Sequence, residues 1–358
     1  MKKLDIYILK KFLGTFVFII ILLSAISIVI DLSEKIDDII ENEVPMNFII
    51  FDYYVNFVPY IVALLGPFFI FIAVIFFTSQ MAGRTEIVAI LSSRVSFNRM
   101  LFPYFVGATI LAFGLLVANH WLVPQANSKR LAFEHEHIRK RFVRYNRNIH
   151  RQIEKNVFMY IETFNGRDTT GKYFTLETIE NGELKVKLKA DKVKWMSKSK
   201  QWRVFNYEIR DFGAAGEELS KGATLDTLLN IHPKDFMKRT SAKEEMTTAE
   251  LSDYIEKLIA SGADNYEFFL IEKHRRTSSA FSIYVLTLIG VSVASRKVRG
   301  GMGLHIVFGI VLSAAYEVIM KFSTTFSTNA DLPPFLGVWI PNIIFTLLAV
   351  YLWKSAPK

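Results

Sequence analysis

Apolar residues fall into two long blocks, at about residues 12–123 and 277–353, and a charged stretch separates the blocks. A helix rises about 1.5 Å per residue, so crossing a hydrocarbon core of about 30 Å takes about 20 apolar residues. Segments that meet this requirement lie at about 12–32, 55–77, 101–123, 277–294, 303–322 and 335–353. Because repeated apolar runs of this length are rare in soluble proteins, the pattern predicts six transmembrane helices.

The stretch between the blocks changes its period. Residues 125–152 are charged and helical in pattern, and we expect them to continue the third span. Apolar residues then alternate with polar ones, as expected of half-buried strands. The alternating residues are Val157, Met159 and Ile161, then Leu184, Val186 and Leu188, then Trp202, Val204 and Phe205. Turn signals at Asn165-Gly166, Asn181-Gly182 and Gly213–Gly216 separate these runs, so an antiparallel β sandwich or jelly roll is predicted.

A helix is expected after the strands, because Thr247 and Glu250 have the spacing of a capping box and Gly262 is placed to end it. A second charged helix, at about 264–276, leads into the fourth span. The predicted fold is an α-helical membrane protein with six transmembrane helices and an inserted antiparallel β-jelly-roll-like domain. Its parts are helices 1–3 in residues 1–124, the β domain with flanking helices in 125–276, and helices 4–6 in 277–358.

Positive charges predict the orientation, because short cytoplasmic loops are enriched in Lys and Arg. With the amino terminus inside, the two short outer loops contain only Lys35 and Lys321. The inner segments contain Lys2, Lys3, Lys10, Lys11, Arg84, Arg94, Arg99, Arg296, Lys297, Arg299, Lys354 and Lys358. Both termini are therefore expected in the cytoplasm, and the β domain in the periplasm of a Gram-negative cell. The apolar run 12–32 is too long for a signal-peptide core, so we interpret it as a retained anchor.

The net charge of +9 does not indicate a nucleic-acid-binding protein, because the basic residues are spread over a domain and gathered at helix ends. The sequence has no cysteine, which excludes disulfides, thiolate nucleophiles and zinc–cysteine sites. No catalytic, cofactor-binding or metal-binding residues are therefore predicted.

Two motifs that resemble chemical sites do not fit them. Residues 166–172 match most of a phosphate-binding loop, but Tyr173 replaces its Ser or Thr, so a β turn is expected. Residues 134–137 read Glu-His-Glu-His, yet positions two apart on a helix do not share a face. A solvated helix face is the better interpretation than a metal site.

Three features have a candidate role. The inner loop can form a short helix at about 82–95 lying on the membrane, with Arg84 and Glu86 as charged contacts; an ordinary interfacial loop is the alternative. Its apolar face is formed by Ile87, Ile90 and Leu91. Glu317 lies within the fifth span, where a carboxylate faces a polar path or pairs for packing. Lys35 can contact an anionic head group at the outer rim, or pair with Glu34 or Asp31.

Several motifs, in order along the chain, resemble the LptF/LptG (YjgP/YjgQ) family of lipopolysaccharide-export permeases. They are Lys3-Leu4-Asp5 with Tyr7 and Lys10, Arg84-Thr85-Glu86-Ile87-Val88, Trp121 with Pro124 and Asn127, Arg296 with Arg299-Gly300-Gly301, and Pro334 with Trp339 and Pro341-Asn342. Each motif alone is weak, whereas the ordered set covers nearly the whole chain. The amino-terminal pattern is closer to the LptG-like members.

The resemblance implies partners and a mechanism. Such a subunit pairs with a second LptF/LptG-type permease, a dimer of the LptB-type cytoplasmic ATPase and an LptC-type single-span protein. The complex is expected to lift lipopolysaccharide from the inner membrane towards an LptA-type periplasmic bridge. The resemblance places Glu86 at the acidic position of a coupling helix pushed by the ATPase, so no ATP site of its own is expected.

Two other functions remain open from the sequence. Another ABC-type permease, such as a lipoprotein-release or cell-division subunit, commonly has four spans rather than six. A membrane enzyme acting on lipids would need a convergent set of catalytic side chains, and the sequence contains no recognisable motif for one.

Overall fold

The computed structural model describes residues 2–138, 145–213, 216–233, 240–263, 266–296 and 301–356. Lys297, Arg299, Gly300 and Lys358, which contribute to the predicted inner charges or to the glycine-rich motif, lie outside these ranges. The described chain divides into two units. The helical unit comprises residues 1–139, 243–251 and 267–358, and the β unit comprises 140–242 and 252–266.

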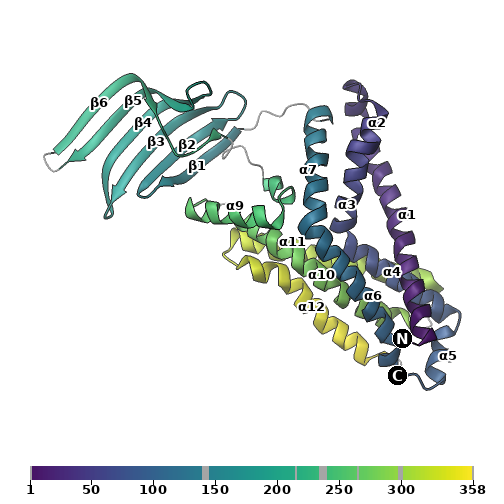
Figure 1. Ribbon diagram of the computed structural model, residues 1–358. Helices are drawn as coiled ribbons and strands as arrows, with labels where there is room; N and C mark the ends of the chain where they lie inside the picture. The colour runs from purple at the N-terminus through teal and green to yellow at the C-terminus, as the bar shows by residue number, and fades with distance from the viewer. Residues whose placement is uncertain are drawn as a thin grey trace. The chain divides into compact units, whose positions relative to one another are not determined.

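The helical unit contains long helices with short connections (Figure 1). Its elements are α1 (Lys3–Glu41), α2 (Met46–Phe48), η1 (Ile49–Tyr54), α3 (Val55–Leu64), α4 (Gly66–Gly83), α5 (Glu86–Ser92), α6 (Phe97–Val117), η2 (Ala118–Leu122), α7 (Val123–Phe133), η3 (Glu134–Ile138), α10 (Tyr266–Ala294), α11 (Gly301–Asn329) and α12 (Pro334–Lys354). The short helix η4 (Thr240–Glu244) begins in the β unit and ends in the helical unit. Helix α9 (Thr248–Ala260) begins in this unit and continues in the β unit.

Seven helices of the described residues are long and apolar enough to cross a membrane. Two of them, Met46–Leu64 and Gly66–Gly83, cover the single span predicted at 55–77. The helix breaks at Leu65 because Pro67 has no N–H for the carbonyl of Ala63 and its ring crowds the preceding turn. The expected membrane helices are thus present, and the second is longer than predicted and broken in the middle.

Hydrogen bonds between distant residues show how the helices run. Tyr7 at the start of α1 donates to Glu86 after α4, and Lys35 near the far end of α1 contacts Tyr53 in η1. The path from α2 to α4 therefore runs antiparallel to α1 and follows the length of the bundle once. Asp5 binds Arg99 at the start of α6, so α6 leads away again.

The last three helices complete the pattern. Ser79 near the end of α4 binds His305 near the start of α11, and Trp353 near the end of α12 donates to Asn98. Both chain ends thus lie at the same end of the helical unit (Figure 1). With Met46–Leu64 and Gly66–Gly83 counted as one path, the seven candidate helices run along the bundle six times, the number of spans predicted.

The β unit contains one antiparallel sheet whose six strands follow the order of the chain. The strands are β1 (Tyr145–Glu154), β2 (Val157–Asn165), β3 (Thr170–Glu180), β4 (Glu183–Met196), β5 (Gln201–Gly213) and β6 (Gly216–Thr227). Asn181 and Gly182 form the two-residue turn between β3 and β4, both with positive φ, as the sequence predicted. The helix expected through residue 152 is wrong from residue 145 onward, because this segment pairs with β2 as a strand.

One face of the sheet holds the apolar core of the β unit. Met159, Ile161, Leu188, Trp202 and Val204 are buried there, as their alternation predicted. The indole N–H of Trp202 donates to the carbonyl of Ile231 at 2.9 Å, which satisfies the one polar atom of this side chain. The opposite face carries charged cross-strand pairs such as Arg203 with Asp226.

Candidate functional sites at the two ends of the helical bundle

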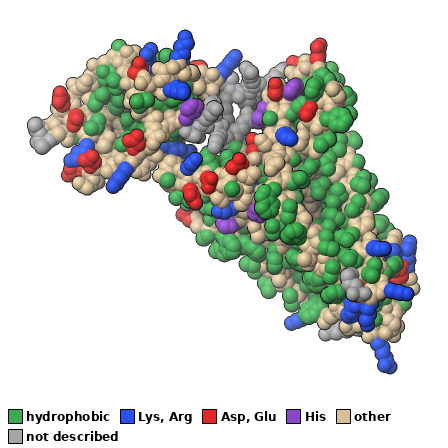
Figure 2. Space-filling model, in the orientation of Figure 1, with side chains coloured by type: hydrophobic (Ala, Val, Ile, Leu, Met, Phe, Trp, Pro, Cys, Tyr) green, Lys and Arg blue, Asp and Glu red, His purple; other side chains and the backbone are tan. Residues whose placement is uncertain are grey.

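The end of the bundle that contains both termini is basic. Exposed basic side chains gather there (Figure 2), whereas apolar side chains cover the middle of the helices. They are Lys2, Lys3, Lys10, Arg84, Arg94 and Lys354. We call this the basic end, and the opposite end of the helical unit the far end.

Helix α5 lies at the basic end between two residues of left-handed conformation. Thr85 has φ 61° and Arg94 has φ 64°, and such backbone costs about 1 kcal/mol or more for a residue with a Cβ. These turns direct the chain from α4 into α5 and from α5 towards α6. A short helix is therefore present in the predicted 82–95 segment, at Glu86–Ser92.

The side chains of α5 divide between the core and the surface. Ile87 is 1% exposed, and Ile90 and Leu91 pack against the same apolar cluster. Val88 on the opposite side is 55% exposed, and Arg84 precedes the helix on the surface. Another protein can therefore reach Arg84 and Val88, whereas Ile87 holds the helix in place.

The carboxylate of Glu86 has a partner within the chain. It accepts a hydrogen bond of 2.8 Å from the hydroxyl of Tyr7 in α1. A second link nearby is the double contact between Arg99 and Asp5, with N–O distances of 2.6 and 2.7 Å. Helix α1 is therefore tied to both α5 and α6 at the basic end.

Lys35 lies at the far end in a network of charged and aromatic side chains. Its ammonium is 2.7 Å from a carboxylate oxygen of Asp31, 4.0 Å from Glu134, and in contact with the Tyr53 hydroxyl. The Lys35 side chain is only 15% exposed. Of the two roles left open by the sequence, the structure shows the pairing with Asp31, and a contact with a lipid head group stays a prediction.

The network continues into α7. The guanidinium of Arg130 lies 3.2 Å from Glu134 and donates to Asn127 at 2.8 Å. Glu134 is 1% exposed, so this carboxylate is a structural ion-pair member and not part of a solvated helix face. The described residues contain no cluster that could hold a metal ion, and Lys172 of the phosphate-loop-like segment lies in strand β3.

A second far-end cluster is centred on Arg276 of α10, whose side chain is 4% exposed. The guanidinium donates to the Thr248 hydroxyl at 3.0 Å and to the carbonyls of Lys243 and Met246 at 3.0 and 2.8 Å. It also lies 3.5 Å from Glu272. Arg276 therefore fixes the segment that starts α9 onto the helical bundle.

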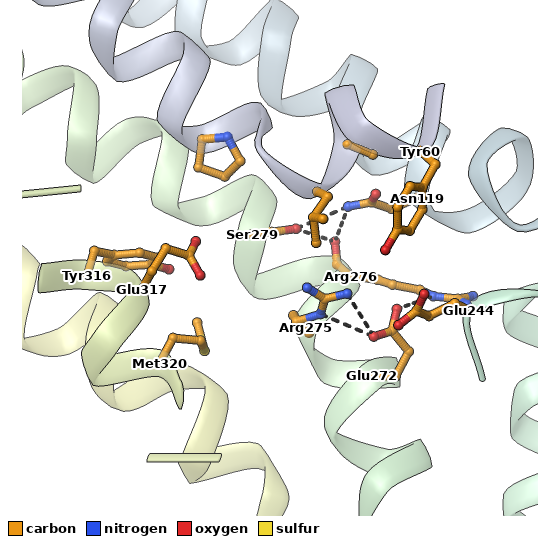
Figure 3. A pocket seen from close by; sticks show the side chains of 13 residues that line it. Tyr60, Asn119, Glu244, Glu272, Arg275, Arg276, Ser279, Tyr316, Glu317 and Met320 are labelled. Atoms are coloured by element: carbon orange, nitrogen blue, oxygen red, sulfur yellow. Dashed lines mark hydrogen bonds and ion pairs between the residues drawn. The ribbon is translucent and has the colours of Figure 1, made fainter. Parts of the chain in front are cut away.

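Neighbouring side chains support this arrangement (Figure 3). Asn119 donates to the Ser279 hydroxyl at 3.1 Å, and His120 shares a 2.7 Å hydrogen bond with Thr248. No sequence pattern indicated these two pairings, since their members come from segments more than 120 residues apart. The one available signal was the Arg275-Arg276 pair at a helix end where few positive charges are expected.

A small cavity lies beside Arg276, with Glu317 and Tyr316 of α11 on its opposite wall (Figure 3). Its volume of about 70 Å³ has room for a few water molecules, but not for a lipid. Glu317 thus faces a polar space within its span, where Arg275 also lies. A polar path at Glu317 and pairing for packing alone both stay predictions.

Comparison with known protein families gives a match over almost the whole chain. The family described as lipopolysaccharide export system permease LptF/LptG matches residues 6–355. No curated protein matches the chain.

Proposed function

Because the chain belongs to the LptF/LptG family of lipopolysaccharide export permeases, we propose that it is one of two permease subunits of an ATP-driven transporter. The transporter takes lipopolysaccharide from the inner membrane and passes it to a periplasmic bridge. The observation that carries the proposal is the family match over residues 6–355, which includes both helical blocks and the β unit.

The orientation we propose places the basic end in the cytoplasm. Exposed Lys and Arg gather at this end, as the positive-inside rule requires, and both termini lie there. Six crossings then leave the chain between the third and fourth crossings, which contains the β unit, in the periplasm.

In this orientation α5 faces the compartment that contains ATP. We therefore assign α5 as the docking site of a cytoplasmic ATPase, with Arg84, Glu86 and the exposed Val88 at the contact. Ile87, Ile90 and Leu91 contribute by anchoring α5 in the core, so that a push on α5 moves the helices behind it.

The partners follow from this assignment. The complex consists of this chain, a second permease of the same family, two ATPase subunits and a single-span LptC-type protein. Lys35 is a candidate for contact with the charged head group of the lipid. Glu317 is a candidate for a polar path within the bundle. The choice between the LptF-like and LptG-like subunit stays a prediction.

The test is purification of the tagged chain from bacterial membranes in mild detergent. We expect a cytoplasmic ATPase and a second six-span permease to co-purify, and α5 to be protected from proteolysis only in the complex. A chain that purifies alone, or a reporter near residue 200 that proves cytoplasmic, would contradict the proposal.

A further inference from the structure

Helix α4 occupies the centre of the helical unit. Of the 18 residues of α4, 72% are buried in the protein, against 11% of the most apolar 18 residues of α1 and 22% of those of α11. Helix α4 packs against both α1 and α11, and it leads directly into α5. A displacement of α5 is therefore transmitted first to α4.

A buried hydrogen bond joins α4 to α11 near the basic end. Nδ1 of His305 lies 2.8 Å from the hydroxyl oxygen of Ser79, and both residues are 4% exposed. Because both groups are buried, separating the two helices breaks a hydrogen bond that solvent replaces poorly. The bond therefore resists sliding or separation of α11 from α4.

One turn further along α11, the two helices meet without space between them. A Cβ on Gly309 would lie 2.4 Å from Cδ1 of Ile75 in α4. On the neighbouring helix α10, a Cβ on Gly290 would lie 2.8 Å from Cγ1 of Val74. Interiors packed this closely transmit displacement instead of absorbing it.

The other side of α11 is exposed and apolar in this chain. Val307, Phe308, Val311 and Val318 lie there, with Val307 62% and Val311 59% exposed. In a membrane this side contacts lipid or another apolar chain. Any movement of α4 that α11 follows therefore moves this surface.

We propose that Ser79, His305 and Gly309 form a joint through which the α4–α5 pair moves α11 when the ATPase acts. His305 and Ser79 are positioning residues: they touch neither ATP nor lipid, and they make α11 follow α4. This inference rests on the proposed function, because it takes α5 as the site of the push.

The first experiment measures lipid release and ATP hydrolysis by the reconstituted complex. We expect His305→Leu and Ser79→Ala to keep basal ATP hydrolysis and to lower lipid released per ATP by about 5-fold or more, the range of a typical coupling free energy. The double variant should be no worse than either single variant, because both remove the same bond. Ser79→Thr, which retains the hydroxyl, should retain most of the release.

Gly309→Val tests the close contact, and Gly303→Val is its matched control. Both glycines lie on α11, but a Cβ on Gly303 meets nothing within 4 Å. Only Gly309→Val should lower release per ATP. The joint would be contradicted if the two glycine substitutions lowered lipid release per ATP equally. It would also be contradicted if His305→Leu released as much lipid per ATP as the wild type.

A distance measurement separates the joint from ordinary packing. The chain has no cysteine, so in a complex whose other subunits are cysteine-free, spin labels at Ser92→Cys and Leu304→Cys report on α5 and α11. The distance should stay constant when ATP binds in the wild type and change in His305→Leu. A wild-type distance that changes with ATP would contradict the joint, whereas a wild-type complex that releases no lipid would contradict the proposed function instead.

Discussion

The two ends of the helical bundle differ in how far their paired charged side chains are exposed. At the basic end, Arg99 is 39% exposed while its partner Asp5 is 1% exposed, and Glu86 is paired near the surface. At the far end both members are buried in the pairs Arg130 with Glu134 and Arg276 with Glu272. The basic end thus leaves charged side chains accessible, whereas the far end uses charge to hold its own segments together.

Burial explains why the consequences differ. A buried charge is tolerated only when hydrogen bonds replace its water, so removing one partner leaves a costly unpaired group. An exposed pair loses little, because water replaces the missing partner. Far-end substitutions should therefore reduce stability, and basic-end substitutions should reduce association with the ATPase.

The largest effect is expected for Arg276→Met. It removes the hydrogen bonds to Thr248, Lys243 and Met246 and takes one of its basic partners from the buried Glu272. The free energy of unfolding should fall by about 3 kcal/mol. The thermal midpoint in detergent should fall and protease should cut near residue 245. Arg203→Met is the control: its side chain and that of its partner Asp226 are 38% and 41% exposed, so the loss should be about 1 kcal/mol or less. Equal destabilisation by the two variants would contradict the difference in burial.

The next effect is expected for Glu86→Ala, which should weaken co-purification of the ATPase by about 10-fold or more if Glu86 is at the centre of the contact. The fold and the thermal midpoint should change little. Tyr7→Phe removes the hydrogen bond to Glu86 but retains the carboxylate. If Tyr7→Phe reproduces the defect, Glu86 acts by fixing α5 to α1 and not by touching the ATPase.

Lys35→Asp is expected to have a smaller effect. It should lower lipopolysaccharide-stimulated ATP hydrolysis roughly 2- to 5-fold, because an anionic lipid loses a cationic partner. Asp31→Asn removes the partner seen in the structure while leaving the ammonium. Stimulation that survives Lys35→Asp, or that falls equally in Asp31→Asn, would remove Lys35 from the lipid contact.

The smallest effect concerns the exposed face of the β unit. Lys221 and Arg210 lower the pKa of Glu208, and Arg203 lowers the pKa of Asp226. Since the folded pKa values lie below the ordinary values of about 4, this stabilisation is present at neutral pH and is lost as pH falls through and below about 4. Glu208→Gln with Asp226→Asn should slightly flatten the pH dependence of the thermal midpoint, followed by the near-UV circular dichroism of the tryptophans. An unchanged pH profile would show that these surface pairs contribute nothing.

Much of the fold was predictable because it depends on local patterns. The long apolar runs gave the membrane helices, and alternation with Asn181-Gly182 gave the hairpin between β3 and β4. The capping box of Thr247 and Glu250 is also present, with the Thr247 N–H donating to Glu250 at 2.8 Å. The break at Leu65 was missed, although Pro67 was its signal within an otherwise continuous apolar run.

The sites were less predictable because their partners are distant in sequence. The sequence indicated Glu86 and Lys35, but not Tyr7 as the partner of Glu86, and Asp31 only as one of two alternatives for Lys35. His305 showed no distinguishing pattern, and Arg276 was marked only by its place in the Arg275-Arg276 pair. The roles of both depend on burial among helices that meet only in the folded protein. Periodicity predicts which face is buried, but it does not predict which polar group lies opposite.

The most direct test of the account is lipid release from proteoliposomes containing this chain with its permease partner and ATPase. With lipopolysaccharide in the membrane and a purified periplasmic acceptor outside, we expect transfer to the acceptor that requires ATP and this chain. Transfer without ATP, no transfer by an assembled complex that hydrolyses ATP, or transfer of a lipoprotein in place of lipopolysaccharide would contradict it.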